Sequence, residues 1–576
     1  MNAATADARG PPARLPATHY SVVIIGAGIN GAGVFRDLCL QGVDCLLIDA
    51  GDVCAGASAG PSRLIHGGIK YLESGEFRLV RQSTLERNLL LKNAPHYVKP
   101  IETVLPIPSW FGGIVPSVVR FFGGHAALRN RGVLITKLGL ELFDLFGRHH
   151  RVMPRHRIAL RRRMRREFPD MAAGIAATAT YFDARITHAE RLGLELVLDG
   201  MAAQPASLAV NHMSLDRCEG GVLVLGDRMT GEMARVTADV VVNATGAWID
   251  RTNAALGLAT RYIAGQKGSH LIVDNPRLLQ ALDGKMVYFG AADGRVALLY
   301  PFMGHVLIGS TDIPIDHPDN ATCSPDERDY MLAVVSEVFP GIPLSADQVI
   351  YTYCGVRPLP RSDAAIPGAV SRDHSIRTDR LLHAAVPVHA LIGGKWTTFR
   401  GFAEEATDRV LADLGRRRCV DTRLLPIGGG RGFPTTTAAR AELVARIAAN
   451  GVSAARAADL LDRYGTRAVD LARWCGVRQD APLRALPDYS RAEIGYILAN
   501  ELVGTLADVV FRRTDIALSG RLTPAVARAV ADVAGDMLGW STERCVRDMA
   551  EIARLAADRH GMADRFDTSL TADALG

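Results

Sequence analysis

Three glycines near the start of the chain have a spacing that suits the binding of a pyrophosphate. Gly26, Gly28 and Gly31 form the pattern G-x-G-x-x-G. In this pattern the first glycine permits a tight turn, the second lets the backbone approach a pyrophosphate, and the third lets a helix pack on a sheet. Asp49 follows at about the distance where a carboxylate can bind a ribose. We therefore predict a dinucleotide site around these residues.

The elements expected around the glycines are those that such a site requires. Residues 21–25 form a short, mostly β-branched run that predicts a strand, and a helical pattern follows over 32–40. Residues 45–48 predict a second strand that ends on Asp49. The start of the helix offers N–H groups and a positive dipole end to phosphates. The alternative is a βαβ unit without a ligand, and the complete order of these elements disfavours it.

Two later segments bear on the identity of the dinucleotide. Residues 240–246 predict a strand that ends in a glycine, and residues 381–412 predict a strand, a Gly-Gly turn and a helix. The glycine spacing alone does not separate NAD from FAD. A cofactor that is held by segments from distant parts of the chain suits FAD, which is long and stays bound.

Composition excludes several classes of protein. The 576 residues carry a net charge of only +5, which does not argue for binding to nucleic acid. The nine cysteines form no C-x-x-C pattern and show no metal-ligand spacing, so we expect no metal and free thiols in a reducing cytosol. No apolar run reaches the ~18–20 residues that span a bilayer. Residues 1–19 lack the apolar core of a secretory signal, and we expect a disordered tail.

Residues 110–166 combine apolar and basic stretches. Residues 134–146 predict an amphipathic helix on which Ile135, Leu138, Leu142 and Leu145 face one way, and seven arginines follow between 155 and 166. One interpretation is ordinary helices with a solvated charged face. The other is a monotopic contact with anionic lipid. The expected location is therefore the cytoplasm, with peripheral attachment to the inner face of the cytoplasmic membrane as the second option.

From about residue 20 to residue 540 the chain resembles the FAD-dependent glycerol-3-phosphate dehydrogenases of the aerobic, respiratory type. The ordered set of motifs is specific although single motifs are not. The matching segments are 24–33, 62–73, 76–80, 242–248, 267–270, 308–312, 353–359, 393–400 and 506–514.

The resemblance implies an α/β fold in which a Rossmann-like FAD domain is interleaved with an α+β substrate domain, followed by an all-α C-terminal domain. We expect the FAD domain over 20–80, 220–262 and 381–420, and the substrate domain over 81–219 and 263–380. The glycine-rich stretch 428–434 reads as a linker, and the helical domain follows over 435–565.

The implied activity is oxidation of sn-glycerol 3-phosphate to dihydroxyacetone phosphate by hydride transfer to flavin N5. A membrane quinone is the implied electron acceptor, and we also expect a homodimer. The candidate catalytic residues are His66, His270, Arg357 and Lys395, with both histidines open as the base. The candidate substrate-binding residues are Lys70, Tyr71, Arg357 and Thr398. FAD contacts are expected from Gly26, Gly28, Asn30, Gly31, Asp49, Ser58, Ser62, Ala244, Thr245, Gly246, Gly394, Lys395 and Thr397.

Lys70 departs from the pattern, because most members have Arg at this position. Lys is a point charge and cannot reproduce the bidentate fork of Arg on a phosphate. A paralogue that oxidises another polyol phosphate or a related hydroxy compound is therefore the first alternative. An FAD-dependent amine or amino-acid oxidase is the second, and it is disfavoured because no aromatic cage is evident beside the flavin motifs.

Overall fold

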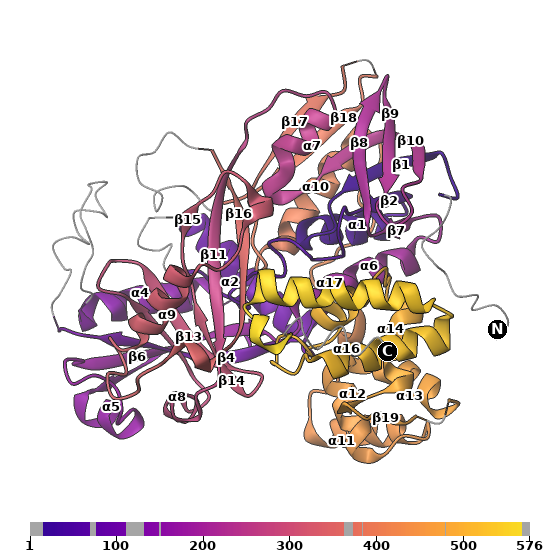
Figure 1. The fold of residues 1–576 in the computed structure, drawn as a ribbon. Coiled ribbons are helices and arrows are strands. Elements are labelled where there is room, and N and C mark those ends of the chain that lie inside the picture. The colour runs from indigo at the N-terminus through magenta and orange to yellow at the C-terminus, as the bar shows by residue number, and fades with distance from the viewer. Residues whose placement is uncertain are drawn as a thin grey trace.

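Two β-sheets and a helical C-terminal part form the protein in a computed structural model, which describes residues 15–69, 76–110, 132–148, 151–361, 373–382, 384–478 and 480–566. The first sheet lies at the upper right of Figure 1 and the second at the lower left. The C-terminal helices, in orange and yellow, lie at the lower right and contact both sheet regions.

The core of the first sheet is parallel. Its strands run in the order β18 (Pro387–Ile392), β10 (Met233–Asn243), β1 (His19–Ile25), β2 (Cys45–Ile48) and β7 (Leu208–Val210). The strand order reverses direction at β1, between β2 and β10. In open sheets of this kind ligands bind at such a switch point, beyond the carboxyl ends of the strands.

Three helices pack together against this sheet, and three further strands extend it. Helices α1 (Ile29–Leu40), α6 (Ala189–Ala203) and α10 (Phe399–Asp413) pack together, with α1 in contact with the other two. The extending strands are β8 (Met213–Glu219), β9 (Val222–Asp227) and β17 (Ser375–Arg380). Residues from all three helices belong to one hydrophobic core with strands β1, β2, β7, β10 and β18.

The second sheet has ten strands and is almost entirely antiparallel, with one parallel pair between β4 and β12. Its strands are β3 (Leu64–Ile65), β4 (Val98–Ile107), β5 (Arg157–Leu160), β6 (Ala177–Ile186), β11 (Ile263–Val273), β12 (Met286–Gly290), β13 (Val296–Phe302), β14 (His305–Gly309), β15 (Ile313–Pro314) and β16 (Val349–Pro360). The helices of this region are α2 (Phe77–Asn93), α4 (Val133–Phe146), α5 (Arg161–Glu167), α8 (Pro276–Leu282) and α9 (Pro325–Val335). Helix α7 (Ile249–Ala255) instead packs against β8, β10 and β18 of the first sheet.

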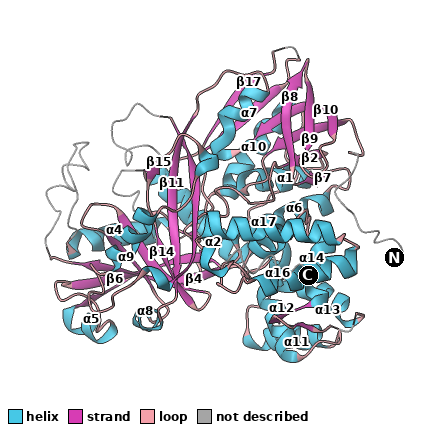
Figure 2. Ribbon diagram, in the orientation of Figure 1, coloured by secondary structure: helices cyan, strands magenta, loops and turns pink. Residues whose placement is uncertain are grey.

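The C-terminal part is helical apart from the short strands β19 (Pro482–Leu483) and β20 (Leu486–Ser490), as Figure 2 shows. Its helices are α11 (Thr437–Ala448), α12 (Ala454–Tyr464), α13 (Ala468–Gly476), α14 (Arg491–Asn500), α15 (Leu506–Asp508), α16 (Pro524–Leu538) and α17 (Thr542–His560). Apolar residues of α14, α16 and α17 share a hydrophobic core with Ile272, Tyr300 and Tyr351 of the second sheet.

Two expected boundaries differ from the structure. Residues 189–219 were expected in the substrate domain, but α6 packs on α1 and β7 pairs with β2, so this stretch belongs to the first sheet. Leu64 and Ile65 instead pair with β6 of the second sheet. These memberships depend on long-range pairing, which local patterns do not encode.

The first residues of the glycine-rich stretch 428–434 are packed into the protein, unlike those of a solvent-exposed linker. Gly429 and Gly430 are buried, and the backbone N–H of Gly429 donates to the Glu195 carboxylate at 3.2 Å. A Cβ on Gly429 would stand 2.2 Å from the carbonyl oxygen of Tyr464. Glycine is therefore required here for close backbone packing rather than for freedom of motion.

The expected amphipathic helix is α4, which buries part of its apolar surface and exposes another part. Val133, Leu140 and Phe143 are buried, whereas Leu134, Leu138 and Leu145 are 55%, 64% and 53% exposed. Much of the surrounding segment, 111–131 with 149 and 150, lies outside the described residues. Within the described ranges no helix has the length and hydropathy needed to cross a bilayer.

Candidate functional site

A cavity of about 1530 Å³ opens between the two sheets at the switch point of the first. Sites for drug-sized ligands usually occupy ~300–1,000 Å³, so this space can hold a longer molecule together with a small second one. It is lined by four segments that are far apart in sequence: 25–30, 49–69, 244–252 and 393–397, each with gaps. Residues of the second sheet, from 286 to 314 and from 355 to 359, close the other side.

The glycine turn has no room for side chains. A Cβ on Gly31 would stand 1.9 Å from the carbonyl oxygen of Gly26, and one on Gly26 would stand 2.7 Å from that of Ala244. Gly26 also has φ of +103°, which side chains strongly disfavour. Gly28 begins α1 without a side-chain cap, and Gly28, Ile29 and Asn30 face the cavity. A helix start that faces a cavity is suited to the pyrophosphate of a dinucleotide.

Asp49 both supports this turn and faces the cavity. Its Oδ2 accepts a hydrogen bond from the N–H of Ala27 at 2.6 Å, and its Oδ1 accepts one from Gly51 at 2.8 Å. Burial raises the pKa of Asp49, and the two N–H groups oppose that effect. A carboxylate has about four acceptor positions, so Asp49 can hold the turn and also accept from a ribose hydroxyl.

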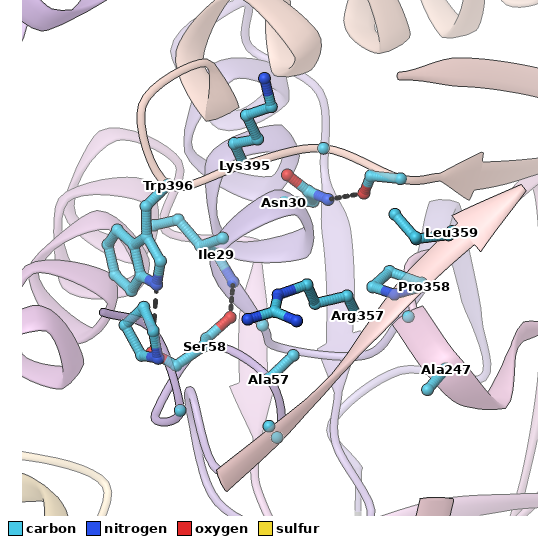
Figure 3. Close-up of a pocket in the computed structure, with 18 of the residues that line it drawn as sticks. Ile29, Asn30, Ala57, Ser58, Ala247, Arg357, Pro358, Leu359, Lys395 and Trp396 are labelled. Atoms are coloured by element: carbon cyan, nitrogen blue, oxygen red, sulfur yellow. Dashed lines mark hydrogen bonds between the residues drawn. The ribbon is translucent and has the colours of Figure 1, made fainter. Parts of the chain in front are cut away.

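The start of α1 is fixed from both sides, as Figure 3 shows. Ser58 Oγ accepts from the N–H of Ile29 at 2.9 Å, and the Ser58 carbonyl accepts from Trp396 Nε1 at 3.1 Å. Asn30 Nδ2 donates to the carbonyl of Gly393 at 3.1 Å. Asn30 Oδ1 is buried and has no hydrogen-bond partner among the described residues. It therefore offers a ligand an acceptor at the junction of three expected FAD-binding segments.

The stretch 244–246 is held by the end of β10. Asn243 Oδ1 accepts from both the N–H of Thr245, at 3.2 Å, and its hydroxyl, at 2.7 Å. Asn243 is itself buried and donates to the carbonyl of Ile249. Ala244, Thr245 and Gly246 consequently lie on the cavity wall next to the glycine turn. These features together fit a bound FAD.

His66 lies on the cavity wall, on a backbone that is tied down at two points. Its N–H donates to Thr397 Oγ1 at 3.1 Å, and the next N–H, of Gly67, donates to Asp183 Oδ1 at 2.8 Å. Asp183 is buried and forms an ion pair with Arg87 at 2.8 Å. The sequence does not single out Asp183, because an acidic residue within a strand gives no indication that it will bind Gly67 and Arg87.

His270 lies behind the cavity wall rather than on it. It is fully buried, its ring stacks on Tyr353, and its Nε2 lies 2.8 Å from Ser62 Oγ. Ser62 does face the cavity. Burial, together with the positive charges of Arg357 and Arg63, holds the pKa of His270 well below its usual value. His270 therefore reaches the cavity through the Ser62 hydroxyl.

Arg357 extends across the middle of the cavity towards Ala57 and Ser58 (Figure 3). It projects from β16 and is 28% exposed. Its Nη1 donates to Asp312 Oδ1 at 2.9 Å, and its Nη2 lies 3.4 Å from Ser310 Oγ. A guanidinium carries five N–H donors in a planar fork, so it can bind Asp312 and a phosphate together.

The remaining predicted residues take different positions. Gly394, Lys395 and Thr397 line the cavity, and the Lys395 side chain points away from Arg357 in Figure 3. Thr398 is buried and begins helix α10 without a side-chain cap bond. Lys70 and Tyr71 lie outside the described residues.

Two family models match the chain. The model described as FAD dependent oxidoreductase covers residues 21–409, and the model described as C-terminal domain of alpha-glycerophosphate oxidase covers residues 420–545. The first matches more than half of the chain, and the second falls on its helical part.

Individual relatives are also similar to the chain over most of its length. The chain is 32% identical to a glycerol-3-phosphate dehydrogenase of Synechocystis sp. over 92% of this chain and 94% of that protein. It is 29% identical to D-erythritol 1-phosphate dehydrogenase of Brucella abortus over 85% of this chain and 93% of that protein. The solved structure of glycerol-3-phosphate dehydrogenase from Bacillus halodurans, complexed with FAD, has a similar fold, with a TM-score of 0.70, 23% identity, and coverage of 94% and 95%.

Proposed function

Because the chain belongs to the FAD-dependent oxidoreductases, and within them to the glycerol-3-phosphate dehydrogenase family, we propose that it oxidises sn-glycerol 3-phosphate to dihydroxyacetone phosphate and passes the electrons to a quinone. The observation that carries this proposal is that Arg357 and His66 both line the cavity, which is large enough for FAD and a small substrate. An anion-binding group and a candidate base thus face one space beside the flavin-binding segments.

Arg357 binds the substrate phosphate and sets its orientation. Asp312, at 2.9 Å from Nη1, holds the guanidinium in place without removing its charge. Holding a substrate in reactive geometry can supply a large part of the rate enhancement of an enzyme. When bound, FAD supplies a hydride acceptor at N5 and a store for two electrons.

His66 accepts the hydroxyl proton of the substrate at a ring nitrogen. Histidine is a common general base because its ring can take up or release a proton in the physiological pH range. The bonds from the 66–67 backbone to Thr397 and Asp183 fix the position of this residue. His270 acts behind Ser62 and holds that hydroxyl in register. Lys395 adds positive charge on the cavity wall, where it favours an anionic reduced cofactor.

A longer polyol phosphate is the second candidate substrate. The similarity to a D-erythritol 1-phosphate dehydrogenase supports it, as does Lys70 at a position where most members of the family have Arg. A lysine binds phosphate as a point charge and tolerates more varied geometry than an arginine fork.

The decisive experiment is anaerobic mixing of the FAD-loaded enzyme with a panel of compounds while flavin absorbance is followed. The panel holds glycerol 3-phosphate, erythritol phosphates, unphosphorylated glycerol and several amino acids. We expect rapid bleaching by glycerol 3-phosphate. Bleaching by another compound and none by glycerol 3-phosphate would refute the assignment. Reoxidation of the bleached enzyme by a soluble quinone analogue, compared with oxygen, tests the acceptor, and sedimentation analysis tests the expected homodimer.

We further propose that the outward face of α4 attaches the enzyme to the surface of a membrane, where a quinone is available. Leu134, Leu138 and Leu145 present an apolar stripe, and Lys137 and Arg148 are exposed beside it. Apolar side chains that enter the interface and cations that meet anionic head groups are the usual components of such a contact.

A further inference from the structure

The loop that follows β2 forms one wall of the FAD cavity. Asp49, Gly51 and Ala55–Ser58 line the cavity, but Asp52 does not. Asp52 is 1% exposed, and its side chain accepts hydrogen bonds from Asn211, at 2.9 Å, and from residues of the C-terminal helical part. The loop thus contacts the cavity on one side and the C-terminal part on the other.

Two consecutive arginines of the C-terminal part bind the Asp52 carboxylate. Arg513 donates from Nη1 at 2.6 Å to one carboxylate oxygen and from Nη2 at 2.7 Å to the other. Arg512 Nε donates to the first of these oxygens at 2.5 Å. Both arginines lie on the π-helical turn Val509–Arg513, and such turns often mark functional positions.

The arginines are themselves held by the C-terminal part. Arg513 also donates to the carbonyls of Glu501 and Leu502, at 2.8 and 3.0 Å, and Arg512 donates to Asp508 at 2.6 Å. The ligand atoms of Asp52, His212 and Asp508 lie within 4.8 Å of one another, a spacing that a metal ion could use. The two guanidinium groups already supply positive charge to both carboxylates, so the cluster serves as a buried ionic link.

The loop needs such an anchor because its backbone is strained. Cys54, two residues after Asp52, is fully buried with φ of +58°, which is unfavourable for a residue other than glycine. Strained conformations of this kind persist only where surrounding contacts over-determine them. The N–H of Cys54 donates to the carbonyl of Ala27, so the strained residue is joined directly to the glycine turn.

We propose that the C-terminal helical domain maintains the FAD site by holding the loop 49–58 through the ion pairs of Arg512 and Arg513 with Asp52. Arg512, Arg513 and Asp52 are positioning residues, because they act on the cofactor through the loop. Removing one partner leaves an uncompensated buried charge, so the loop relaxes from the geometry that fits FAD. The proposal does not depend on the identity of the substrate.

The test is the dissociation constant of FAD, measured by titrating apoenzyme and following flavin fluorescence. We expect Asp52→Asn and Arg513→Gln to weaken FAD binding by about tenfold or more, within the range usual for coupling between sites. Arg513→Lys retains the charge without the planar fork, so we expect a smaller loss. Circular dichroism of each apoenzyme shows whether it is folded. If Arg513→Gln does not fold, the isosteric variant Asp52→Asn provides the test.

Glu493→Gln is the matched control. Glu493 is fully buried in the C-terminal part and forms an ion pair with Arg463 at 3.2 Å. Among the described residues, neither partner bonds to the loop 49–58, to Arg512 or to Arg513. We expect lower thermal stability for this variant with FAD affinity within twofold of the original protein. An equal loss of FAD affinity in Glu493→Gln, or unchanged affinity in folded Asp52→Asn and Arg513→Lys, would overturn the proposal.

Discussion

The guanidinium of Arg357 lies against the α-carbon of Gly268, so that a Cβ at position 268 would stand 2.2 Å from Nη2 and 2.6 Å from Cζ. The two residues lie on the paired strands β16 and β11. The absence of a side chain at position 268 therefore lets the Arg357 side chain lie over the neighbouring strand β11 and enter the cavity.

Gly268→Ala is expected to displace Arg357 while leaving FAD bound. A misplacement of about 1 Å can cost ~10²-fold in rate, so we expect a loss of that order in kcat/KM for glycerol 3-phosphate. Gly290→Ala in β12 is the control, because a Cβ there meets no atom within 4 Å. Steady-state kinetics and flavin content decide the outcome, and equal activities of the two variants would contradict it.

Gly31→Ala is expected to prevent FAD binding. The added Cβ would stand 1.9 Å from the carbonyl oxygen of Gly26, so the glycine turn must open. The flavin content of the purified protein, from its absorbance spectrum, measures the effect. Gly139→Ala in α4 is a matched helical control with no atom within 4 Å of the new Cβ. A Gly31→Ala protein that retains stoichiometric FAD would show that the turn does not cradle the cofactor.

The two histidines are expected to differ in their effect on catalysis. His66→Asn removes the proposed base, so the rate of anaerobic flavin bleaching should fall by ~10²–10⁴-fold. His270→Asn and Ser62→Ala should each cost less than that, because His270 reaches the cavity only through the Ser62 hydroxyl. Stopped-flow measurements at saturating substrate distinguish these effects. The opposite ranking would assign the base to the Ser62–His270 pair.

The stability of the protein is expected to fall as the pH rises above about 6.5, because His212 loses its proton. Burial alone would lower the pKa of His212, but the hydrogen bond and charge of Asp508 raise it above its ordinary value. A raised pKa in the folded state gives a contribution that is complete below the unfolded value of ~6.5 and is lost as the pH rises through the folded value. Unfolding temperatures measured from about pH 6.5 upwards should therefore decline more steeply with pH for the original protein than for His212→Gln. Parallel curves would exclude this histidine as the source.

Leu138→Glu is expected to weaken attachment to membranes without changing the activity on soluble substrates. Leu138 is 64% exposed on α4, and a carboxylate there opposes entry into an anionic interface. Flotation with vesicles that contain anionic lipid measures attachment. Val477→Glu in the C-terminal part, which is 78% exposed in the original protein, is the control. If both variants float like the original protein, α4 is not the contact.

The βαβ unit at which we expect the cofactor to bind was largely predictable because its parts are local. The turn at Gly26, Gly28 and Gly31, the strand before it and Asp49 after it lie within one βαβ unit. The closest contact that excludes a side chain at Gly31, with the carbonyl of Gly26, also lies within that unit. FAD as the cofactor, the presence of two sheet regions and the helical C-terminal part also followed from motif order, and the comparisons support them.

Only the tertiary structure determined which residues meet. The sequence singled out His66 and His270 alike, and long-range strand pairing placed the first on the cavity and the second behind Ser62. The same pairing assigned α6 and β7 to the first sheet. The link from Asp52 to Arg513 spans 461 positions of the chain. Such contacts arise from burial and charge pairing between distant segments, and no local pattern records them.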